Sequence, residues 1–373
     1  MRKYFLLTAL ALVLVVVATA FGQNARFIRS RHLQLGVGFK TWKFEGASGV
    51  TRFTQTAFPV VYRFPLSNRL GVDFVTSPFL SKAQKPAGDD VKFNNVTDTL
   101  VRASYLIGNN LALLTFGVGL PTGQTELSSD ELLLSGLAAN RPLDYPVSSF
   151  GTGLTLVAGL AVAQPVGSWV IGFGAGYAFR QEYDATVSGT AFTVNPGNEL
   201  NLTFGLDREF ADGRTKFSAD LIYTNYSEDK SEGEAVFEAG DKFVVRGQLL
   251  FPLGLFDPVI VTALYRWRLD NRSTNAALLD NSNQFHARAV FWHPLSRSFR
   301  LKYVVDADLY SNTVVGANGA TLFGFGGGLF LRLSRIVALD PTVVFRTGKI
   351  NTGPGTQVDV TGLEVTGGLA FTY

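Results

Sequence analysis

Apolar and polar residues alternate with a period of two along most of this chain, and this pattern restricts its fold more than any other feature. Between Phe299 and Tyr310, apolar residues recur at every second position, and the charged residues lie between them. In a strand such charges share one face, whereas in a helix of about 3.6 residues per turn they would spread around the axis. Segments near 199–207, 216–224 and 242–251 alternate in the same way. These segments are predicted to be β-strands with one apolar and one polar face.

The composition indicates a membrane environment that is crossed without helices. Hydrophobic residues make up 46% of the chain and charged residues 17%, whereas soluble domains carry about 25% charged residues. After the first twenty residues, no apolar run reaches the roughly 18 residues that a spanning helix needs. Only helices and closed barrels pair every backbone polar group within a bilayer. The prediction is an all-β, closed antiparallel transmembrane barrel. A soluble sandwich or propeller is disfavoured, because outward faces this apolar would aggregate in water.

The first 22 residues have the features of a secretory signal peptide. Arg2 and Lys3 precede an apolar stretch from Tyr4 to Val17, and small residues follow it up to Gly22. Cleavage is expected after Gly22, or alternatively after Ala20, which leaves residues 23–373 as the mature barrel. The chain has no cysteine, which excludes disulfides and thiolate metal sites. Its formal net charge of +3 gives no indication of a nucleic acid partner.

Short turns and longer polar loops separate these segments, and the two kinds of connection alternate along the chain. Short periplasmic turns and longer outer loops are typical of outer-membrane barrels. The prediction is about sixteen strands with both termini on the short-turn side, or fourteen or eighteen if one hairpin is misread. The predicted strands are 32–44, 50–64, 68–79, 92–107, 110–121, 151–164, 168–181, 197–210, 214–227, 238–252, 257–270, 283–294, 298–311, 319–333, 335–348 and 358–373.

Aromatic residues gather near both ends of the predicted strands. Two aromatic girdles, one at each membrane interface, are expected of such a barrel. The residues assigned to the short-turn girdle are Trp169, Trp292 and Phe299, and those assigned to the long-loop girdle are Tyr177, Tyr223, Trp267 and Tyr310.

A barrel of 16–18 strands leaves an aqueous lumen, so the inward faces decide its function. Charged residues dominate the predicted inward face of strands nine to thirteen. They are Asp220, Lys242, Arg246, Arg266, Arg268, Arg288, Arg300, Lys302, Asp306 and Asp308. One interpretation is a cationic ladder that favours anionic or polar solutes. The other is a set of cross-strand salt bridges that stiffen the wall.

Glycines occupy the inward positions of strands five to seven and fourteen, where they allow another segment to approach the wall. They are Gly117, Gly119, Gly172, Gly174, Gly176, Gly324, Gly326 and Gly328. The longest outer loop, about 122–150, is expected to fill this space.

A helix is predicted within this loop. It starts at Ser128, with acidic residues in its first turn, and an apolar patch of Leu132, Leu133, Leu134 and Leu137 follows. We expect the helix to fold over or into the mouth as a gate or ligand platform. The alternatives are a lid packed on the loop's own residues, or a contact between protomers.

Three prolines, Pro59, Pro78 and Pro341, lie in or at the ends of predicted strands, where each implies a bulge or a local gap. Pro59 and Pro78 fall on adjacent strands. They either open a lateral exit to the membrane or mark ordinary kinks.

The final strand alternates apolar residues up to Phe371 and the terminal Tyr373. This ending resembles the signal by which the barrel assembly machinery recognises outer-membrane barrels. The resemblance implies two partners, the assembly machinery and outer-membrane lipid.

The segment from Leu114 to Gly123, Leu-Thr-Phe-Gly-Val-Gly-Leu-Pro-Thr-Gly, resembles a strand and turn of the phenol-degradation (MetA-pathway) outer-membrane proteins. It is also similar to the wider fatty-acid and hydrocarbon transporter barrels, and the match continues through Phe150–Gly153 to about residue 183. The resemblance implies passive uptake of small, partly hydrophobic or aromatic compounds. Those transporters carry an N-terminal plug and usually have fewer strands, whereas the first strand here begins close to Gln23.

The sequence therefore favours a channel or passive transporter for small solutes in the bacterial outer membrane, with no cofactor or metal. A structural or surface-binding barrel is the alternative. An outer-membrane lipid enzyme is disfavoured, because the sequence has no Gly-x-Ser-x-Gly motif that would supply a nucleophilic serine. The three histidines are His32, His286 and His293. The oligomeric state is not predicted.

Overall fold

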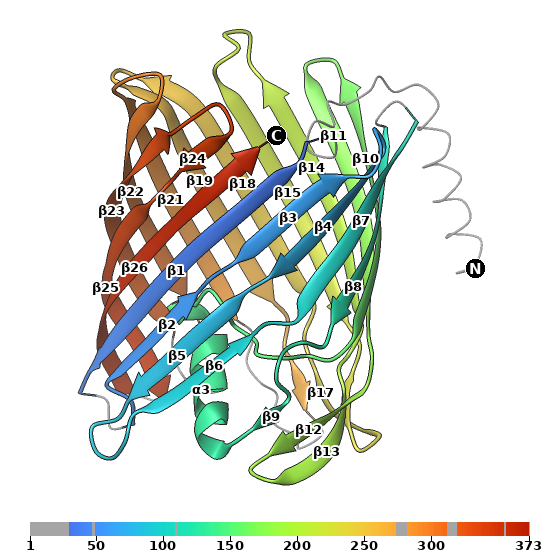
Figure 1. Cartoon of the computed structure of the whole chain (residues 1–373), viewed down its shortest axis with the longest axis vertical. Helices are drawn as coiled ribbons and strands as arrows, with labels where there is room; N and C mark the ends of the chain where they lie inside the picture. Colours follow the sequence, from blue (N-terminus) through green and yellow to red (C-terminus); the bar gives the residue numbers. More distant parts are fainter. Residues whose placement is uncertain are drawn as a thin grey trace.

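The computed structural model describes residues 30–46, 49–108, 111–273, 282–311, 319–353 and 356–372. They form a closed antiparallel barrel with short turns at one end and long loops at the other (Figure 1). The predicted signal peptide and Tyr373 lie outside the described residues.

Within the described ranges, twenty strand segments make the wall. In chain order they are β1 (His32–Glu45), β2 (Arg52–Ala57), β3 (Val60–Pro65), β4 (Leu70–Thr76), β5 (Pro78–Gln84), β6 (Val91–Val96), β7 (Thr99–Ile107), β8 (Ala112–Leu120), β10 (Thr155–Val166), β11 (Trp169–Arg180), β14 (Glu199–Glu209), β15 (Lys216–Tyr226), β18 (Lys242–Leu253), β19 (Phe256–Arg268), β21 (Asn283–Pro294), β22 (Phe299–Tyr310), β23 (Ala320–Arg332), β24 (Val337–Leu339), β25 (Thr342–Gly353) and β26 (Thr356–Thr372).

Four wall strands are interrupted and consist of two segments each: β2 with β3, β4 with β5, β6 with β7, and β24 with β25. Across the described residues the wall therefore has sixteen strands, which confirms the predicted number. The first and last strands close the barrel, because β1 pairs with β26 from His32 opposite Thr372 to Glu45 opposite Asp359. Complete closure leaves no open sheet edge around the ring.

Three of the four interruptions coincide with Pro59, Pro78 and Pro341, as the sequence predicted, whereas the break between β6 and β7 has no proline. The wall stays paired across Pro59 and Pro78. The Phe58 amide donates to the Pro78 carbonyl at 2.8 Å, and the Gly36 amide donates to the Pro59 carbonyl at 2.8 Å. Pairing shifts by one residue near Ser77, between the β4–β7 and β5–β6 pairings. These features are kinks and a bulge, and the structure shows no lateral opening at the two prolines.

In the described part of the chain, the long-loop end carries a second, smaller sheet and an α-helix (Figure 1). The sheet runs in the order β20 (Arg272–Ser273), β17 (Glu234–Glu238), β16 (Asp229–Ser231), β13 (Thr190–Asn195), β12 (Tyr183–Val187) and β9 (Glu126–Leu127). The helix α3 (Ser129–Ala139) and the 3₁₀-helix η2 (Arg141–Leu143) lie in the longest loop. Among the described residues, none of the helices is long and apolar enough to cross a membrane.

The outer surface of the barrel exposes large apolar side chains, as expected of a wall that faces lipid. Phe116, Phe173, Phe323 and Phe325 are each more than half exposed. Five of the seven aromatic residues assigned to the girdles occupy outward positions. The assignment is wrong for Trp292, which lies opposite inward-facing Lys302, and for Tyr310, which is buried. Both residues were assigned to the girdles because they lie near strand ends. The alternation itself places them on the inward face, since Tyr310 is two residues after Asp308 and Trp292 is four after Arg288.

Candidate functional site in the barrel lumen

Side chains that face the lumen form continuous rows across neighbouring strands. In the pairing of β21 with β22, Arg288 lies opposite Asp306 and His286 lies opposite Asp308, whereas Val305 and Leu309 are exposed on the outside. The same alternation holds through the pairings from β15 to β23. It places all ten predicted charged residues on the inner face: Asp220, Lys242, Arg246, Arg266, Arg268, Arg288, Arg300, Lys302, Asp306 and Asp308.

Two of the acidic residues share one arginine, Arg346 of β25, which sequence reasoning missed. Arg346 is 4% exposed, and its guanidinium lies 3.2 Å from Asp306 and 3.3 Å from Asp308. Asp308 is also 2.8 Å from Nδ1 of His286. Because these charges are buried, their mutual pairing offsets the cost of removing them from water.

Two further pairs involve predicted residues. Arg246 lies 2.5 Å from Asp220, and Lys302 lies 2.5 Å from Asp340. These members of the inner row therefore form ion pairs of the kind that the salt-bridge interpretation describes.

Lys40 connects the wall to the longest loop. Its ammonium group donates to the Asp144 carbonyl at 2.7 Å and lies 3.1 Å from the Asp144 carboxylate. Glu364 of β26 is 3.2 Å from Lys40 and 3.3 Å from Arg346. The sequence analysis missed Lys40 and Glu364, although both occupy inward positions of alternating strands and could have been found by extending the inward count to the first and last strands.

Three further side chains attach the longest loop to the inner wall by hydrogen bonds to backbone. Trp42 and Gln55 belong to the wall, and Tyr145 belongs to the loop. Trp42 Nε1 donates to the Leu143 carbonyl at 2.8 Å. The Tyr145 hydroxyl donates to the Phe53 carbonyl at 2.7 Å. The Gln55 amide donates to the Val147 carbonyl at 2.9 Å, and its oxygen accepts from the Val147 amide at 2.7 Å.

A hydrophobic core lies inside the barrel where this loop meets the wall. Its members from the wall include Trp42, Phe53, Phe79, Phe93 and Leu322, and its members from the loop are Leu134, Ala138, Leu143, Tyr145, Val147 and Phe150. Figure 1 shows α3 behind β5 and β6 at the long-loop end. No residue of β10 or β11 belongs to this core. The prediction that the loop fills the space beside the glycine-lined strands is therefore wrong for β10 and β11.

The helix begins where the sequence predicted. Ser128 is its N-cap, with Oγ accepting from the Glu131 amide at 3.3 Å while the Ser128 amide donates to the Glu131 carboxylate at 2.8 Å. The predicted apolar patch divides into two parts. Leu134 is fully buried and Leu137 packs against the core, whereas Leu132 and Leu133 are 46% and 40% exposed.

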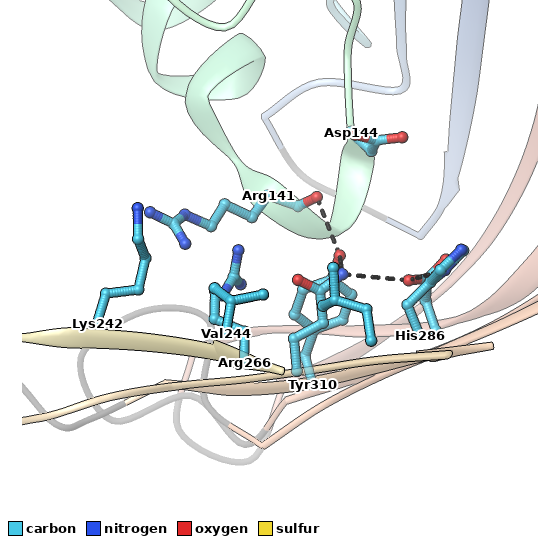
Figure 2. A pocket seen from close by; sticks show the side chains of 10 residues that line it. Arg141, Asp144, Lys242, Val244, Arg266, His286 and Tyr310 are labelled. Carbon is cyan, nitrogen blue, oxygen red and sulfur yellow. Dashed lines mark hydrogen bonds and ion pairs between the residues drawn. The ribbon is translucent and has the colours of Figure 1, made fainter. Parts of the chain in front are cut away.

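A group of basic residues faces a cavity of about 430 Å³ between the loop and the wall. Arg141 enters from η2, Lys242 and Arg266 come from β18 and β19, and Figure 2 shows the Arg141 side chain extending towards Lys242. Tyr310 donates a hydrogen bond to the Arg141 carbonyl at 3.3 Å, which fixes the loop backbone at this point. Sequence reasoning missed Arg141, since only the fold brings the loop to this wall.

Arg268 completes the group, which we call the basic cluster: Arg141, Lys242, Arg266 and Arg268. The Arg268 guanidinium lies 5.3 Å and the Lys242 ammonium 5.5 Å from the ring centre of Tyr226. Among the described residues, none of the four forms an ion pair with a carboxylate. Burial, and then the proximity of Arg268, lower the pKa of Arg141, which nevertheless stays protonated because arginine does not deprotonate in proteins.

Three cavities follow the wall from the loop towards the short turns. The first, beside the basic cluster, shares Leu264 and His286 with a second of about 480 Å³. The second shares Asp207 and Ser218 with a third of about 400 Å³, which reaches Gly167 in a short turn. The three cavities, each sharing lining residues with the next, form a series along β14, β15, β18, β19 and β21, which we call the lumen path.

The inward glycines are of two kinds. At Gly176 of β11, the nearest atom to an added Cβ would be 3.8 Å away, so this wall has free space. At Gly326 of β23, a Cβ would lie against the Val343 carbonyl oxygen and 2.7 Å from the Val344 Cα. The first kind widens the lumen, and the second lets neighbouring strands approach closely.

A smaller charged group nearer the short turns was also missed. Asp73 is 5% exposed, lies 2.7 Å from Arg102 and is paired with Arg63. All three residues occupy inward positions. Within the described part of the chain, no group of three or more side chains is arranged to hold a metal ion.

No family model matches the chain, and no curated protein sequence matches it. Several solved structures are similar in architecture. The CymD monoaromatic hydrocarbon channel is 12% identical, with a TM-score of 0.46 over 95% of this chain and 94% of its own. The outer membrane channel DcaP of Acinetobacter baumannii is 11% identical, with a TM-score of 0.44 over 95% and 100%. The anion-selective porin from Comamonas acidovorans is 14% identical, with a TM-score of 0.42 over 92% and 100%.

All three are channels or porins. At identities this low, the function of the present chain has to be inferred from its own lumen.

Proposed function

We propose that this protein is a passive channel for small solutes in the bacterial outer membrane. The observation that carries the proposal is the lumen path, a series of cavities that share lining residues from the loop end to the short-turn end. A barrel of this strand number is wide enough for an aqueous passage. The apolar outer surface supports a position in lipid.

The longest loop acts as a fixed constriction in this proposal. Its core and its hydrogen bonds from Trp42, Gln55 and Tyr145 hold it on one side of the lumen. The opposite side, along β14 to β21, carries the lumen path. Exposed Leu132 and Leu133 would then form an apolar platform at the mouth, which is compatible with the partly hydrophobic solutes that the sequence resemblance implies.

Recognition by the barrel assembly machinery remains a prediction. Phe371 belongs to β26, which pairs with β1 along its length, so correct insertion of this strand is required for closure. Tyr373 lies outside the described residues.

The channel proposal is tested by reconstituting the purified mature barrel in planar lipid bilayers. We expect steady single-channel conductance in potassium chloride. Permeation of sugars of increasing size into proteoliposomes would then measure the effective width of the passage. A correctly folded barrel that shows no conductance and no solute permeation would contradict the proposal and favour a structural or surface-binding barrel.

A further inference from the structure

We propose that the basic cluster is a binding site for small organic anions that carry carboxylate or phosphate groups. The proposal rests on the channel function, since the site lies on the lumen path, and it names the solute class that the passage would favour. The site is formed by Arg141, Lys242, Arg266 and Arg268, with Tyr226 and Tyr310 beside them.

Charge balance is the first argument. Other basic side chains of the lumen have an acidic partner, as Arg246 has Asp220 and Lys302 has Asp340. Arg288 and Arg300 also form no ion pair among the described residues, but the basic cluster brings four such cations together around one cavity. The two carboxylates that line the cavity are engaged elsewhere, Asp144 with Lys40 and Asp308 with His286 and Arg346. Holding several like charges together without a counter-charge is costly away from bulk water. An anion entering this position would remove that cost.

Unused hydrogen-bond donors are the second argument. Nε and Nη2 of Arg266 and Nε of Arg268 are buried and have no hydrogen-bond partner in the described structure. Buried donors are nearly always paired, so unpaired ones indicate a missing acceptor. The guanidinium fork matches the oxygens of carboxylate and phosphate groups, which bind it with two parallel hydrogen bonds.

The rest of the cavity lining defines the shape of the ligand. Val244 and Leu264 lie in the same inward rows as the basic residues and contribute an apolar surface. A volume of about 430 Å³ accommodates a small molecule rather than a bare ion alone. The site is completed only when the loop is attached to the wall, because Arg141 comes from η2.

The test is inhibition of the chloride current through single channels by three probes: inorganic phosphate, benzoate and benzyl alcohol. Benzoate and benzyl alcohol share the aromatic ring but differ in charge. We expect phosphate and benzoate to reduce the current at concentrations where benzyl alcohol has no effect. Arg266→Gln and Lys242→Gln should each weaken inhibition roughly tenfold, since a charge-assisted hydrogen bond is lost.

Arg246→Gln is the matched control. It removes the same charge from a residue of the same wall, but Arg246 already has Asp220 as a partner. We expect this variant to alter conductance without weakening inhibition by phosphate to the same degree. An equal loss in the control, or inhibition by benzyl alcohol as strong as by benzoate, would overturn the anion site while leaving the channel function standing.

Equilibrium binding separates the two proposals if the barrel proves not to conduct. Radiolabelled phosphate is then titrated against the intact, detergent-solubilised barrel. Binding that is lost in Arg266→Gln would support the anion site although the channel proposal had failed. Absence of binding in the unsubstituted protein would overturn the anion site as well.

Discussion

At the scale of single residues, Gln55 shows how the lumen is divided. Its side chain is fully buried and satisfies both the amide and the carbonyl of Val147, so it replaces the partner that a neighbouring strand would provide. A buried backbone group that loses its partner costs about 1–3 kcal/mol. One side chain on the wall therefore contributes substantially to holding the loop in the barrel.

Gln55→Leu is expected to lower the free energy of unfolding by about 2 kcal/mol, because the Val147 amide and carbonyl lose their partners in a buried site. The measurement is urea-induced unfolding of the barrel in lipid vesicles, followed by tryptophan fluorescence, with buried Trp42 as a reporter. Gln248→Leu is the control, since Gln248 also faces the lumen but makes no side-chain hydrogen bond to any described residue. Equal destabilisation by both substitutions would show that the Val147 contact is unimportant.

At the scale of elements, several strands reverse their polarity near the long loops. On β1, Trp42 and Phe44 are buried on the inside, whereas Lys43 is exposed on the outside. On β2, Phe53 faces inward and Thr54 outward. Apolar-inside alternation is that of a water-soluble sheet, so these strand ends extend beyond the lipid-facing belt and build the core that receives the loop.

The glycines of β23 provide an element-scale prediction. Gly326→Ala should reduce the amount of folded barrel strongly, because its methyl group would meet the backbone of β25 at Val343 and Val344. Gly176→Ala on β11 is the matched control, with 3.8 Å to the nearest atom. The measurement is the heat-modifiable shift of the folded barrel in gel electrophoresis. Similar yields for the two variants would contradict the close approach of β23 and β25.

At the scale of the whole molecule, the lumen has two unlike halves. The outer ends of β1, β2, β5 and β6, together with those of β22, β23, β25 and β26, hold the loop in a hydrophobic core. The wall from β14 to β21 carries the lumen path. A series of hydrogen bonds and ion pairs runs from His286 through Asp308, Arg346 and Glu364 to Lys40, lies across the boundary and joins the wall to Asp144 of the loop.

Deletion of residues 128–139 is expected to raise single-channel conductance, because α3 occupies part of the mouth beside β5 and β6. The measurement is the conductance of the shortened barrel in planar bilayers. Replacement of residues 229–238 by a short linker is the control, since β16 and β17 belong to the small outer sheet and contribute nothing to the lumen core. Unchanged conductance after the α3 deletion would refute the role of the helix as a constriction.

Local pattern was sufficient to predict the barrel. Alternation with a period of two reports which face of a strand meets lipid, and alternating turn lengths report strand number and orientation, so the sixteen strands and the ten inward charges follow from the sequence. The start of α3 was predictable as well, because Ser128 and Glu131 cap it through local hydrogen bonds. Only the tertiary structure decided which side chains interact with one another. Closure of the barrel decides which segments lie together. It therefore decides that Arg246 has an acidic partner and Arg266 has none, and that Arg141 of the loop reaches the wall at β18 and β19. Contacts between residues far apart in the chain leave no periodic signal in the sequence.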